Sequence, residues 1–497
     1  MVESQYKKEI VNFFLNNDIL LDIDSLDKFS YDNMKVFYNY LRDKQFVIDS
    51  SVNEDNYLHF MQGVINKYSS ELQQKVSGKL EAKVEVVFSY KDFYKKKDLN
   101  DFVNYFNCRY KQLRNILDTR PELTNLTAIT RVTGKNKDNV SIIGMIIEKE
   151  QTKNNNIMLT VEDPTGVMKV LVTQNKEELY NIAQNLVYDE VIGINGVAGD
   201  KIIFANNILF PDIPLTKELK KSPEEVYAVF LSDVHVGSGN FLGEKYDKFI
   251  KWINGKIGSS EQREMVKKIR YVFIAGDLVD GIGIYPGQDK DLMIKDIYEQ
   301  YTECARLLSQ IPEYIQIIIC PGNHDAMRLS EPQPLLYKDY AQAIYELPNV
   351  TLVSNPAVVN VHKTDGFPGF NVLMYHGSSF DYYLANVDEL RLNGGYDRPD
   401  LMMKFLLQRR HLAPTYNSTP CLPDGTKDNL VIETIPDIFL TGHIHKCTIA
   451  NYRNVTLVAG STWQERTEYE AKLGHHPEPA RVPLINLKTR KAKILKF

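Results

Sequence analysis

Cysteine is scarce in this chain of 497 residues, which contains only Cys108, Cys304, Cys320, Cys421 and Cys447. These positions are odd in number and scattered, and no two of them form a CxxC pair. Disulfide-rich secreted folds and zinc-thiolate sites both depend on paired cysteines, so neither class is indicated. Free thiols are typical of a reducing compartment, and we expect a cytoplasmic protein.

The sequence also lacks long apolar runs. No stretch reaches the roughly 18 apolar residues that a membrane-spanning helix needs. The chain begins with MVESQYKKEIVNFFLNN, which has neither the uninterrupted apolar region nor the small-residue cleavage site of a signal peptide. We therefore expect no membrane partner.

A strong charge of either sign is absent as well. The formal net charge of -5 is slight for a chain of this length, so no protein-wide positive field can gather a nucleic acid. Bound divalent cations would nevertheless add positive charge at one place. DNA therefore remains a possible partner, provided that it is held locally.

Apolar and charged residues are present in the proportions of a globular protein. The composition is 43% hydrophobic and 25% charged. Domains usually contain roughly 100–200 residues, so we expect about two to four of them. The chain has enough apolar residues to bury real cores.

The pattern of apolar residues changes along the first half of the chain. Residues 1–70 have apolar positions at helical spacing and predict a small helical module. Residues 71–121 are polar and predict a connector that ends in an amphipathic helix, LNDFVNYFNCRYKQLRNIL. Residues 122–215 alternate as strands do and predict an OB-type β-barrel, in which LTVEDPTGVMKVLV resembles the strand-turn-strand core of nucleic-acid-associated OB folds. Few aromatic residues lie on these strands, so a role in protein contact or scaffolding is as well supported as DNA binding.

The remainder, residues 225–497, alternates buried strands with helices and predicts a layered α/β domain. The whole chain is therefore expected to be a multidomain α/β protein. Polar residues follow five of its strands, VYAVFLSD, RYVFIAGD, IQIIICPGN, FNVLMYHG and PDIFLTGH. Ligands of α/β proteins gather at the carboxyl ends of the strands, so the chemistry is expected there.

Five short motifs at these strand ends carry the candidate chemistry. They are Asp233-x-His235, Gly276-Asp277, Gly322-Asn323-His324-Asp325, His376-Gly377 and Gly442-His443-x-His445. Each motif alone is a weak signal, but five at consecutive strand ends argue strongly against coincidence. Imidazole, carboxylate and carboxamide groups suit Mn, Fe, Ni or Zn better than Ca, and a carboxylate can bridge two such ions. A pair of divalent ions activates water for in-line attack on phosphorus.

This motif set resembles the calcineurin-like metallophosphoesterase superfamily over roughly residues 225 to 480. The resemblance implies that one metal is held by Asp233, His235 and His445, the other by Asn323, His376 and His443, with Asp277 between them.

The resemblance also suggests catalytic side chains beside the metals. It makes His324 the group that protonates the leaving oxygen or stabilises the transition state. Asp325 either orients His324 or caps the turn, and Asp280 is a candidate for contacts behind the ligands or toward the substrate.

The flanking sequences narrow the family further. PGNHDAMRLSEPQPLL, HGSSFDY, IPDIFLTGHIHK and GSTWQERTEYEAKLGHHPEPARVPLINL are similar to the small subunits of archaeal family D DNA polymerases. In that family the small subunit is a Mn-dependent, proofreading 3′-5′ exonuclease. The resemblance implies as partners a large catalytic subunit, DNA with single-stranded 3′ ends or primer-template, and a sliding clamp through the holoenzyme.

Other interpretations of the same motifs remain open. An independent DNA-repair nuclease shares the five motifs, and a scaffold subunit of the polymerase could retain them without catalysis. A small-molecule phosphodiesterase is the third alternative. The polarity of digestion comes from the resemblance alone.

Several further residues are expected to have ordinary roles. Arg409 and Arg410 are candidates for phosphate or partner contact, although surface salt bridges are the simpler expectation. We expect a surface or structural place for His59, His362 and His411, and an exposed loop for His475 and His476.

Overall fold

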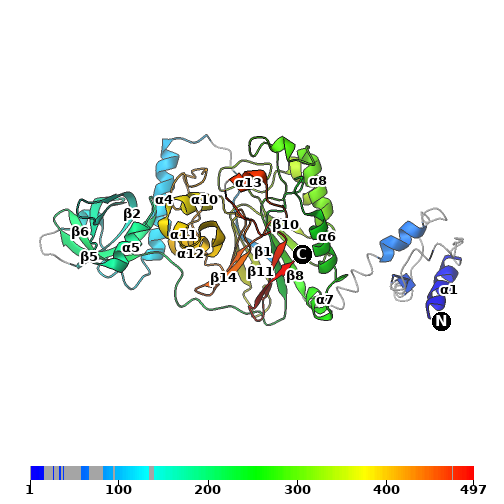
Figure 1. The fold of residues 1–497 in the computed structure, drawn as a ribbon. Helices are drawn as coiled ribbons and strands as arrows, with labels where there is room; N and C mark the ends of the chain where they lie inside the picture. Colours follow the sequence, from blue (N-terminus) through cyan, green and yellow to red (C-terminus); the bar gives the residue numbers. More distant parts are fainter. Residues whose placement is uncertain are drawn as a thin grey trace. The chain divides into compact units, whose positions relative to one another are not determined.

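A computed structural model describes residues 2–15, 26, 33–34, 37–38, 57–65, 82–92, 96–133, 139–472 and 474–497. The chain divides into two compact units, one of residues 1–81 with 312–314, the other of residues 82–311 with 315–497. Helix α1 (Val2–Leu15) belongs to the first unit (Figure 1). It contributes the buried Phe14, which stacks on Phe37 at a centroid distance of 6.1 Å. Periodic apolar residues thus form a small core here, as predicted.

The second unit contains most of the secondary structure. Its strands are β1 (Val84–Ser89), β2 (Asn139–Gln151), β3 (Ile157–Asp163), β4 (Gly166–Val172), β5 (Val191–Gly199), β6 (Ile202–Leu209), β7 (Tyr227–Leu231), β8 (Ile269–Ala275), β9 (Gln316–Cys320), β10 (Val350–Leu352), β11 (Ala357–Val361), β12 (Phe370–Met374), β13 (Ile438–Thr441), β14 (Thr448–Tyr452), β15 (Val455–Ala459), β16 (Arg481–Asn486) and β17 (Ala492–Lys496). Its α-helices are α4 (Leu99–Leu117), α5 (Glu177–Gln184), α6 (Gly243–Ile253), α7 (Ser260–Val266), α8 (Ile297–Leu308), α9 (Lys338–Tyr345), α10 (Phe380–Asn386), α11 (Asp388–Leu392), α12 (Pro399–Arg409) and α13 (Glu468–Lys472).

Strands β2 to β6 close into a barrel in the order β2-β3-β4-β6-β5. All neighbouring strands are antiparallel except β4 and β6, which run parallel because helix α5 and strand β5 lie between them in the sequence. Alternating apolar side chains, among them Ile142, Leu159 and Val170, fill the barrel. A five-stranded barrel therefore occupies the segment whose strand-like period predicted one.

The remaining strands form two six-stranded sheets, β1-β11-β12-β13-β15-β14 and β10-β9-β8-β7-β16-β17. Strands β7, β8 and β9 are parallel, as are β12, β13 and β15. The sheets share one apolar core, in which Phe230 and Phe273 of one sheet belong to the same cluster as Val372 and Leu440 of the other. This sandwich brings the carboxyl ends of both parallel sets to the same region.

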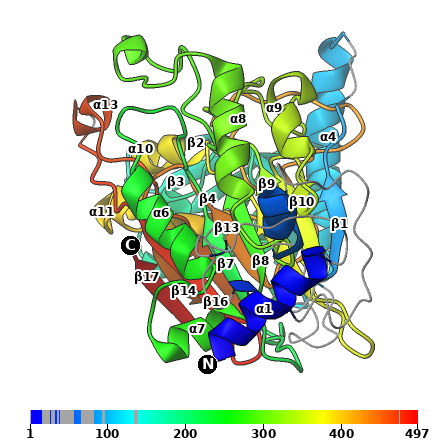
Figure 2. The same cartoon turned by 90° about the vertical axis from the view of Figure 1, so that its right-hand side faces the viewer.

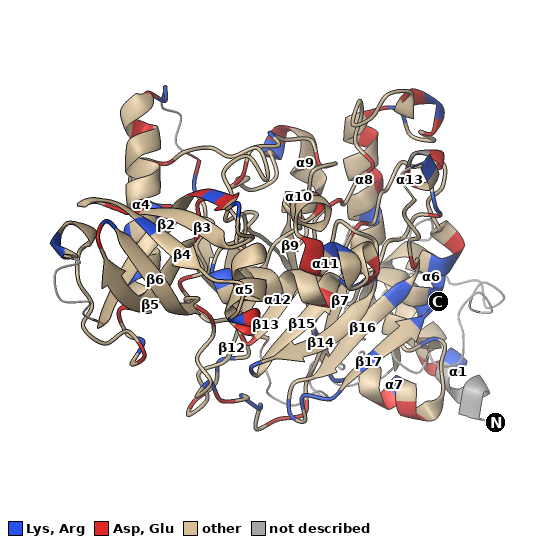
Figure 3. Ribbon diagram, turned by 60° about the vertical axis from the view of Figure 1, so that its left-hand side comes forward, with Lys and Arg blue, Asp and Glu red and all other residues tan. Residues whose placement is uncertain are grey.

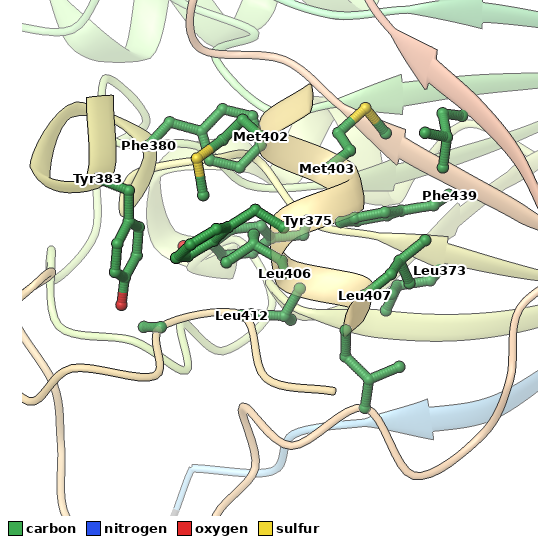
Figure 4. Close-up of a cluster of buried hydrophobic side chains, with 14 of the residues drawn as sticks. Leu373, Tyr375, Phe380, Tyr383, Met402, Met403, Leu406, Leu407, Leu412 and Phe439 are labelled. Atoms are coloured by element: carbon green, nitrogen blue, oxygen red, sulfur yellow. The ribbon is translucent and has the colours of Figure 1, made fainter. Parts of the chain in front are cut away.

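Helices cover the outer faces of the sandwich. Helices α6 and α8 lie on the sheet that contains β8 (Figures 1 and 2), and α10 and α12 lie on the other. Figure 4 shows Met402, Met403 and Leu406 of α12 packed near Leu373 and Phe439 of that sheet. The multidomain α/β fold class, with a layered α/β region, is confirmed.

The segment expected to be a connector holds two ordered elements. Helix α4 coincides with the predicted amphipathic helix and begins at a capping box formed by Asp98 and Asp101. Strand β1 was not expected, yet it pairs antiparallel with β11 at the edge of a sheet. Its valines Val86 and Val87 are partly exposed. The domain boundaries drawn from the sequence remain predictions.

The cysteines and the helix lengths bear on disulfides and membrane spans. All five cysteines are free. Within the described ranges, no helix has both the length and the apolar character required to cross a bilayer.

Candidate metal centre

The five motifs follow five strands of the sandwich. The loops after β7, β8 and β9 carry Asp233, His235, Asp277 and Asn323, and the loops after β12 and β13 carry His376, His443 and His445. All seven residues come from strand ends that the two-sheet arrangement brings together.

The first group of predicted ligands is compact. The Nε2 atoms of His235 and His445 lie 3.2 Å apart, and Nε2 of His445 lies 3.5 Å from Oδ1 of Asp233. Ligand atoms about 2.1 Å from one metal lie roughly 3.0–3.5 Å from each other, so these three side chains have the spacing of a metal site.

The second group has a similar spacing. Oδ1 of Asn323 lies 2.9 Å from Nε2 of His376 and 3.0 Å from Nδ1 of His443. Without a metal, the carboxamide oxygen of Asn323 can accept one hydrogen bond from each of the two imidazole rings. The same three atoms can also point their lone pairs at a shared cation.

Asp277 lies between the two groups. Its Oδ2 is 3.3 Å from Nε2 of His376 and 3.9 Å from Nε2 of His235. Its Oδ1 accepts a hydrogen bond from the backbone N–H of His324 at 2.8 Å, which fixes the carboxylate plane. The position suits a carboxylate shared by two ions.

Each histidine of the centre uses its other ring nitrogen to contact an oxygen. His235 contacts Asp280 at 3.2 Å, His445 contacts Glu470 at 2.7 Å, His443 contacts Asp381 at 2.9 Å and His376 contacts the carbonyl of Ala275 at 2.8 Å. Such partners fix the tautomer and orientation of metal-binding imidazoles. Asp381 and Glu470 were missed by the sequence, because no motif spacing links them to the histidines they hold.

The electrostatics of the pocket favour bound positive charge. Burial acts to lower the pKa of His376, but the carboxylates of Asp277 and Asp233 outweigh it and raise the pKa to about 10. Burial is likewise outweighed at His445, where Asp233 and Glu470 raise the pKa to about 10. Carboxylates that hold a proton on buried imidazoles this strongly would hold divalent cations in its place.

His324 lies at the edge of the centre. Its Nδ1 donates to the carbonyl of Asp280 at 2.8 Å, and its ring meets the His235 ring edge-on at a centroid distance of 4.6 Å. Burial lowers the pKa of His324. With Nδ1 committed to the carbonyl, Nε2 is the nitrogen available for proton transfer.

Asp325 does not orient this imidazole directly. Its carboxylate accepts backbone N–H groups of Asp277 at 3.0 Å and Gly322 at 2.8 Å, and the hydroxyl of Tyr301 at 3.3 Å. Burial, followed by repulsion from Asp277, raises the pKa of Asp325 to about 7. Of its two expected roles, these contacts agree with fastening the turn, and the carbonyl of Asp280 does the orienting.

The backbone at the centre is strained. Positive φ angles occur at Asp233, His235, Asp277, His443 and His445, with values between 50° and 72°. Such conformations cost about 1–3 kcal/mol each in residues other than glycine and cluster at functional sites. The surrounding sandwich must stabilise these backbone conformations. No sequence pattern predicted them.

A cavity of about 280 Å³ opens over the centre. Its lining consists of His235, Asp277, Asp280, Ile284, Tyr285, Asn323, His324, Asp381, His443, Ile444, His445, Gln464, Thr467, Glu470 and His475. Asp233 and His376 lie below the lining and are fully buried. The candidate site is therefore a solvent-open pocket with its ligands on the floor.

The two arginines considered for phosphate contact are buried and lie elsewhere. Arg409 pairs with Glu190 at 2.8 Å and packs on Phe405, so it links the barrel to α12. Arg410 donates to the carbonyls of Ile432 and Glu433 at 2.6 Å each. Both are structural, which corrects the expectation of a surface position.

The remaining histidines divide as follows. His362 and His411 are buried and pair with Glu224 and Asp428, while His59 and His476 are exposed. His475 differs from the expectation of an ordinary exposed loop, because it is half-buried and lines the cavity.

The match to a protein-family model agrees with this geometry. Residues 227–447 match the family model of the calcineurin-like phosphoesterases, and this segment contains all the predicted ligands. Such a domain implies divalent metal ions, and the Asp and His groups described above fit them.

Individual relatives define the family more narrowly than the family model does. The DNA polymerase II small subunit of Methanothermobacter thermautotrophicus is 40% identical over 389 residues, which cover 78% of each chain. Its counterpart in Archaeoglobus fulgidus is 40% identical over 78% of this chain and 75% of its own. That of Pyrococcus abyssi is 41% identical over 80% of this chain, which spans only 63% of that longer protein. The chain belongs to the family of archaeal family D DNA polymerase small subunits, whose members are named DNA polymerase II small subunit.

Proposed function

We propose that this chain is the proofreading 3′-5′ exonuclease subunit of a two-subunit DNA polymerase. It would hydrolyse the terminal phosphodiester of single-stranded or mismatched 3′ ends and release a 5′-mononucleotide. The observation that carries this proposal is the meeting of the seven predicted ligand side chains, Asp277 lying between two groups of three, with His324 at their edge. A scaffold subunit would have no need of five strained ligand positions.

Two divalent transition-metal ions would supply the positive charge and the activated water that phosphodiester hydrolysis requires. Asp233, His235 and His445 would hold one, and Asn323, His376 and His443 the other, with Asp277 shared. The mixed nitrogen and oxygen set suits manganese, and also iron, zinc or nickel. Manganese is the ion that the family resemblance favours.

The protein's own groups position the reaction. His324, whose Nδ1–H is held by the Asp280 carbonyl, would take up a proton from solvent at Nε2 and pass it to the leaving 3′-oxygen as general acid. Asp325 ties the loop of Asp277 to that of Gly322, so that the shared carboxylate and His324 keep a fixed separation. Asp280, Glu470 and Asp381 hold three of the ligand imidazoles in one orientation.

The assembly proposed around this subunit follows from its family. A large catalytic subunit would carry out polymerisation, and primer-template DNA would reach the exonuclease after the 3′ end frays, since mismatched ends require less unpairing energy. Contact with a sliding clamp would come through the holoenzyme, and the compartment would be the cytoplasm. The five-stranded barrel has the strand order of an OB-type fold and is available for either subunit or DNA contact.

Two substitutions test the catalytic assignment. His324→Ala should lower the rate of digestion of 5′-labelled single-stranded DNA by about 10²–10⁴-fold with the metal still bound, because it removes a proton donor. Asn323→Ala should lower both the rate and the metal content, because it removes a ligand. Exposed residues provide matched controls, His59→Ala and Asn104→Ala, which should behave as wild type.

Other outcomes would favour the alternatives. Digestion that proceeds unchanged in both variants would remove the catalytic assignment and favour a scaffold with a contaminating nuclease. Faster hydrolysis of cyclic nucleotides than of DNA ends would identify a small-molecule phosphodiesterase. Digestion of duplex ends without any large subunit would favour an independent repair nuclease.

A further inference from the structure

The cavity over the metal centre lacks cationic side chains. No Lys or Arg occurs among the described residues that line it. Proteins that hold a nucleic-acid backbone usually do so with such groups, and their affinity then falls steeply with salt. Apart from the phosphate at the metals, the substrate must be held here through its bases and sugars.

An aromatic pair at the cavity wall can supply that contact. The rings of Tyr396 and His475 have centroids 4.3 Å apart and an interplanar angle of 38°, so they are in close contact but tilted against each other. His475 lines the cavity, whereas Tyr396 is not among the lining residues and contacts the His475 ring. Both side chains are only partly exposed, which limits their freedom to rotate.

The pair is joined to the metal centre by hydrogen bonds. The hydroxyl of Tyr396 donates to Oδ1 of Asp381 at 2.8 Å, and Oδ2 of Asp381 contacts Nε2 of His443 at 2.9 Å. The rings therefore sit at a fixed distance from a predicted ligand, as a surface that positions a nucleotide against the reacting phosphate requires.

A second wall belongs to the loop after β8. Ile284 lines the cavity and is 37% exposed, and its backbone N–H donates to Gln288 at 2.9 Å. Gln288 in turn donates to Asp280 at 3.0 Å, the residue whose carbonyl holds His324. This apolar wall is thus braced to the proposed general acid, whereas the aromatic pair is braced to His443.

We propose that His475, packed against Tyr396, stacks the base of the terminal nucleotide that is cleaved off, while the strand that remains lies against Ile284. This inference rests on the proposed exonuclease function. The two sides are assigned by the leaving 3′-oxygen. This oxygen belongs to the strand that remains and takes its proton from His324, so this strand must lie on the His324 side of the cavity. Every base has a π-face, so stacking accepts any terminal nucleotide, as removal of all mismatches requires.

The test compares two short substrates in the full-length protein with manganese. One is a thymidine dinucleotide, and the other has the base of its 3′-terminal nucleotide replaced by hydrogen. Both contain the same scissile phosphodiester. For the wild type we expect a KM about tenfold lower for the dinucleotide that keeps its terminal base, the size of effect that one stacked base gives.

Variants at the aromatic pair should abolish this difference. Tyr396→Leu and His475→Ala should each bring the ratio of the two KM values close to one, and Tyr396→Phe, which keeps the ring, should change it less. Tyr340→Leu, at an exposed tyrosine of α9 outside the cavity, should retain the wild-type ratio. If a thermal melt shows that the Tyr396→Leu variant is unfolded, the ratio of the two KM values in the His475→Ala variant decides whether the inference holds.

Three results would overturn the inference. The first is a KM ratio that stays at its wild-type value in both variants. The second is an equal loss of kcat on both substrates, which would mean that Tyr396 acts through Asp381 and His443 and does not position His475 for stacking. The third is a wild-type protein that cleaves neither dinucleotide although it digests longer single strands. A wild type that digests no DNA at all would instead overturn the proposed function, and this inference with it.

Discussion

At the residue scale, Gly322 has the tightest surroundings among the motif glycines. A methyl group there would lie 2.6 Å from the backbone nitrogen of Asp277 and 2.8 Å from Cε1 of His376. Its φ angle is not positive, so space rather than backbone conformation demands glycine. A sequence comparison of turn types would not reveal this reason.

Gly322→Ala should therefore damage the metal site. The methyl would displace Asp277 or His376, and we expect at least a tenfold loss of metal affinity together with the loss of exonuclease rate. Metal content by plasma mass spectrometry measures the first effect. Gly243→Ala is the control, because its added methyl would meet only Phe241 at an ordinary 3.7 Å. Equal metal content in both variants would contradict the proposed crowding.

His411 makes stability depend on pH. Its Nε2 donates to Asp428 at 2.9 Å and its Nδ1 accepts from the backbone of Ala413 at 2.9 Å, so the buried ring is neutral. Burial, then the charge of Arg109, lowers its pKa from 6.5 to about 4. The unfolded chain thus binds the proton more readily, and stability is complete above pH 6.5 and is lost as the pH falls toward 4.

Urea unfolding of His411→Gln tests this effect. Between about pH 7 and pH 5 the wild type should lose about 2 kcal/mol through this one group, and the variant should not show that part of the loss. His59→Gln, at an exposed position, is the control. A variant with the same pH slope as the wild type would show that His411 titrates normally.

The residues of the centre differ in how far sequence could predict them. The candidate ligands occur in short motifs after buried strands, so residue type and order were enough to group them. Asp381 and Glu470 come from α10 and α13, and only the folded chain shows that they face His443 and His445.

At the element scale, helix α4 is fixed to the phosphoesterase region by a buried ion pair. Nε of Arg109 lies 2.7 Å from Oδ2 of Asp428, and both side chains are almost fully buried. Arg109 also donates to the hydroxyl of Tyr105 at 2.7 Å and to the carbonyl of Pro414. One residue of the helix thus satisfies groups on two separate segments.

Arg109→Met should destabilise the protein strongly. It leaves the Asp428 carboxylate buried with only its His411 and backbone partners, and breaking such a pair costs about 3–5 kcal/mol. Denaturant unfolding measures the change, with Lys111→Met on the exposed face of the same helix as control. A loss below about 1 kcal/mol would mean that the pair contributes little.

Elements with strong periodicity were predictable, and those that depend on distant partners were not. Helix α4 has a clear apolar stripe and a capping box, and its limits agree with the prediction. Strand β1 owes its existence to pairing with β11, more than 260 residues away in the sequence. Its sequence alone could not reveal that pairing.

At the scale of the whole molecule, the predicted ligands and the cavity residues all belong to the second unit. Lys and Arg are interspersed with Asp and Glu along the ribbon in Figure 3, in agreement with the small net charge of -5. Weak general attraction to DNA is therefore expected, and a partner subunit would have to deliver the strand.

Removal of residues 1–81 should leave the centre intact. The shortened chain, beginning at Ala82, keeps every predicted ligand, and we expect it to bind as much manganese as the full chain and to digest short single strands. Metal content and the melting temperature of the two proteins provide the comparison. Loss of bound metal from the shortened chain would contradict the independence of the second unit.

The most direct test of the central claim is the digestion of a 3′-mismatched primer by the co-purified complex of this chain with its large subunit. With manganese present, we expect stepwise shortening from the 3′ end with release of 5′-mononucleotides, faster for the mismatched than for the matched primer. The same complex with Asn323→Ala should lack this activity. Undiminished 3′ digestion by the Asn323→Ala complex, or no digestion by the wild-type complex, would contradict the account.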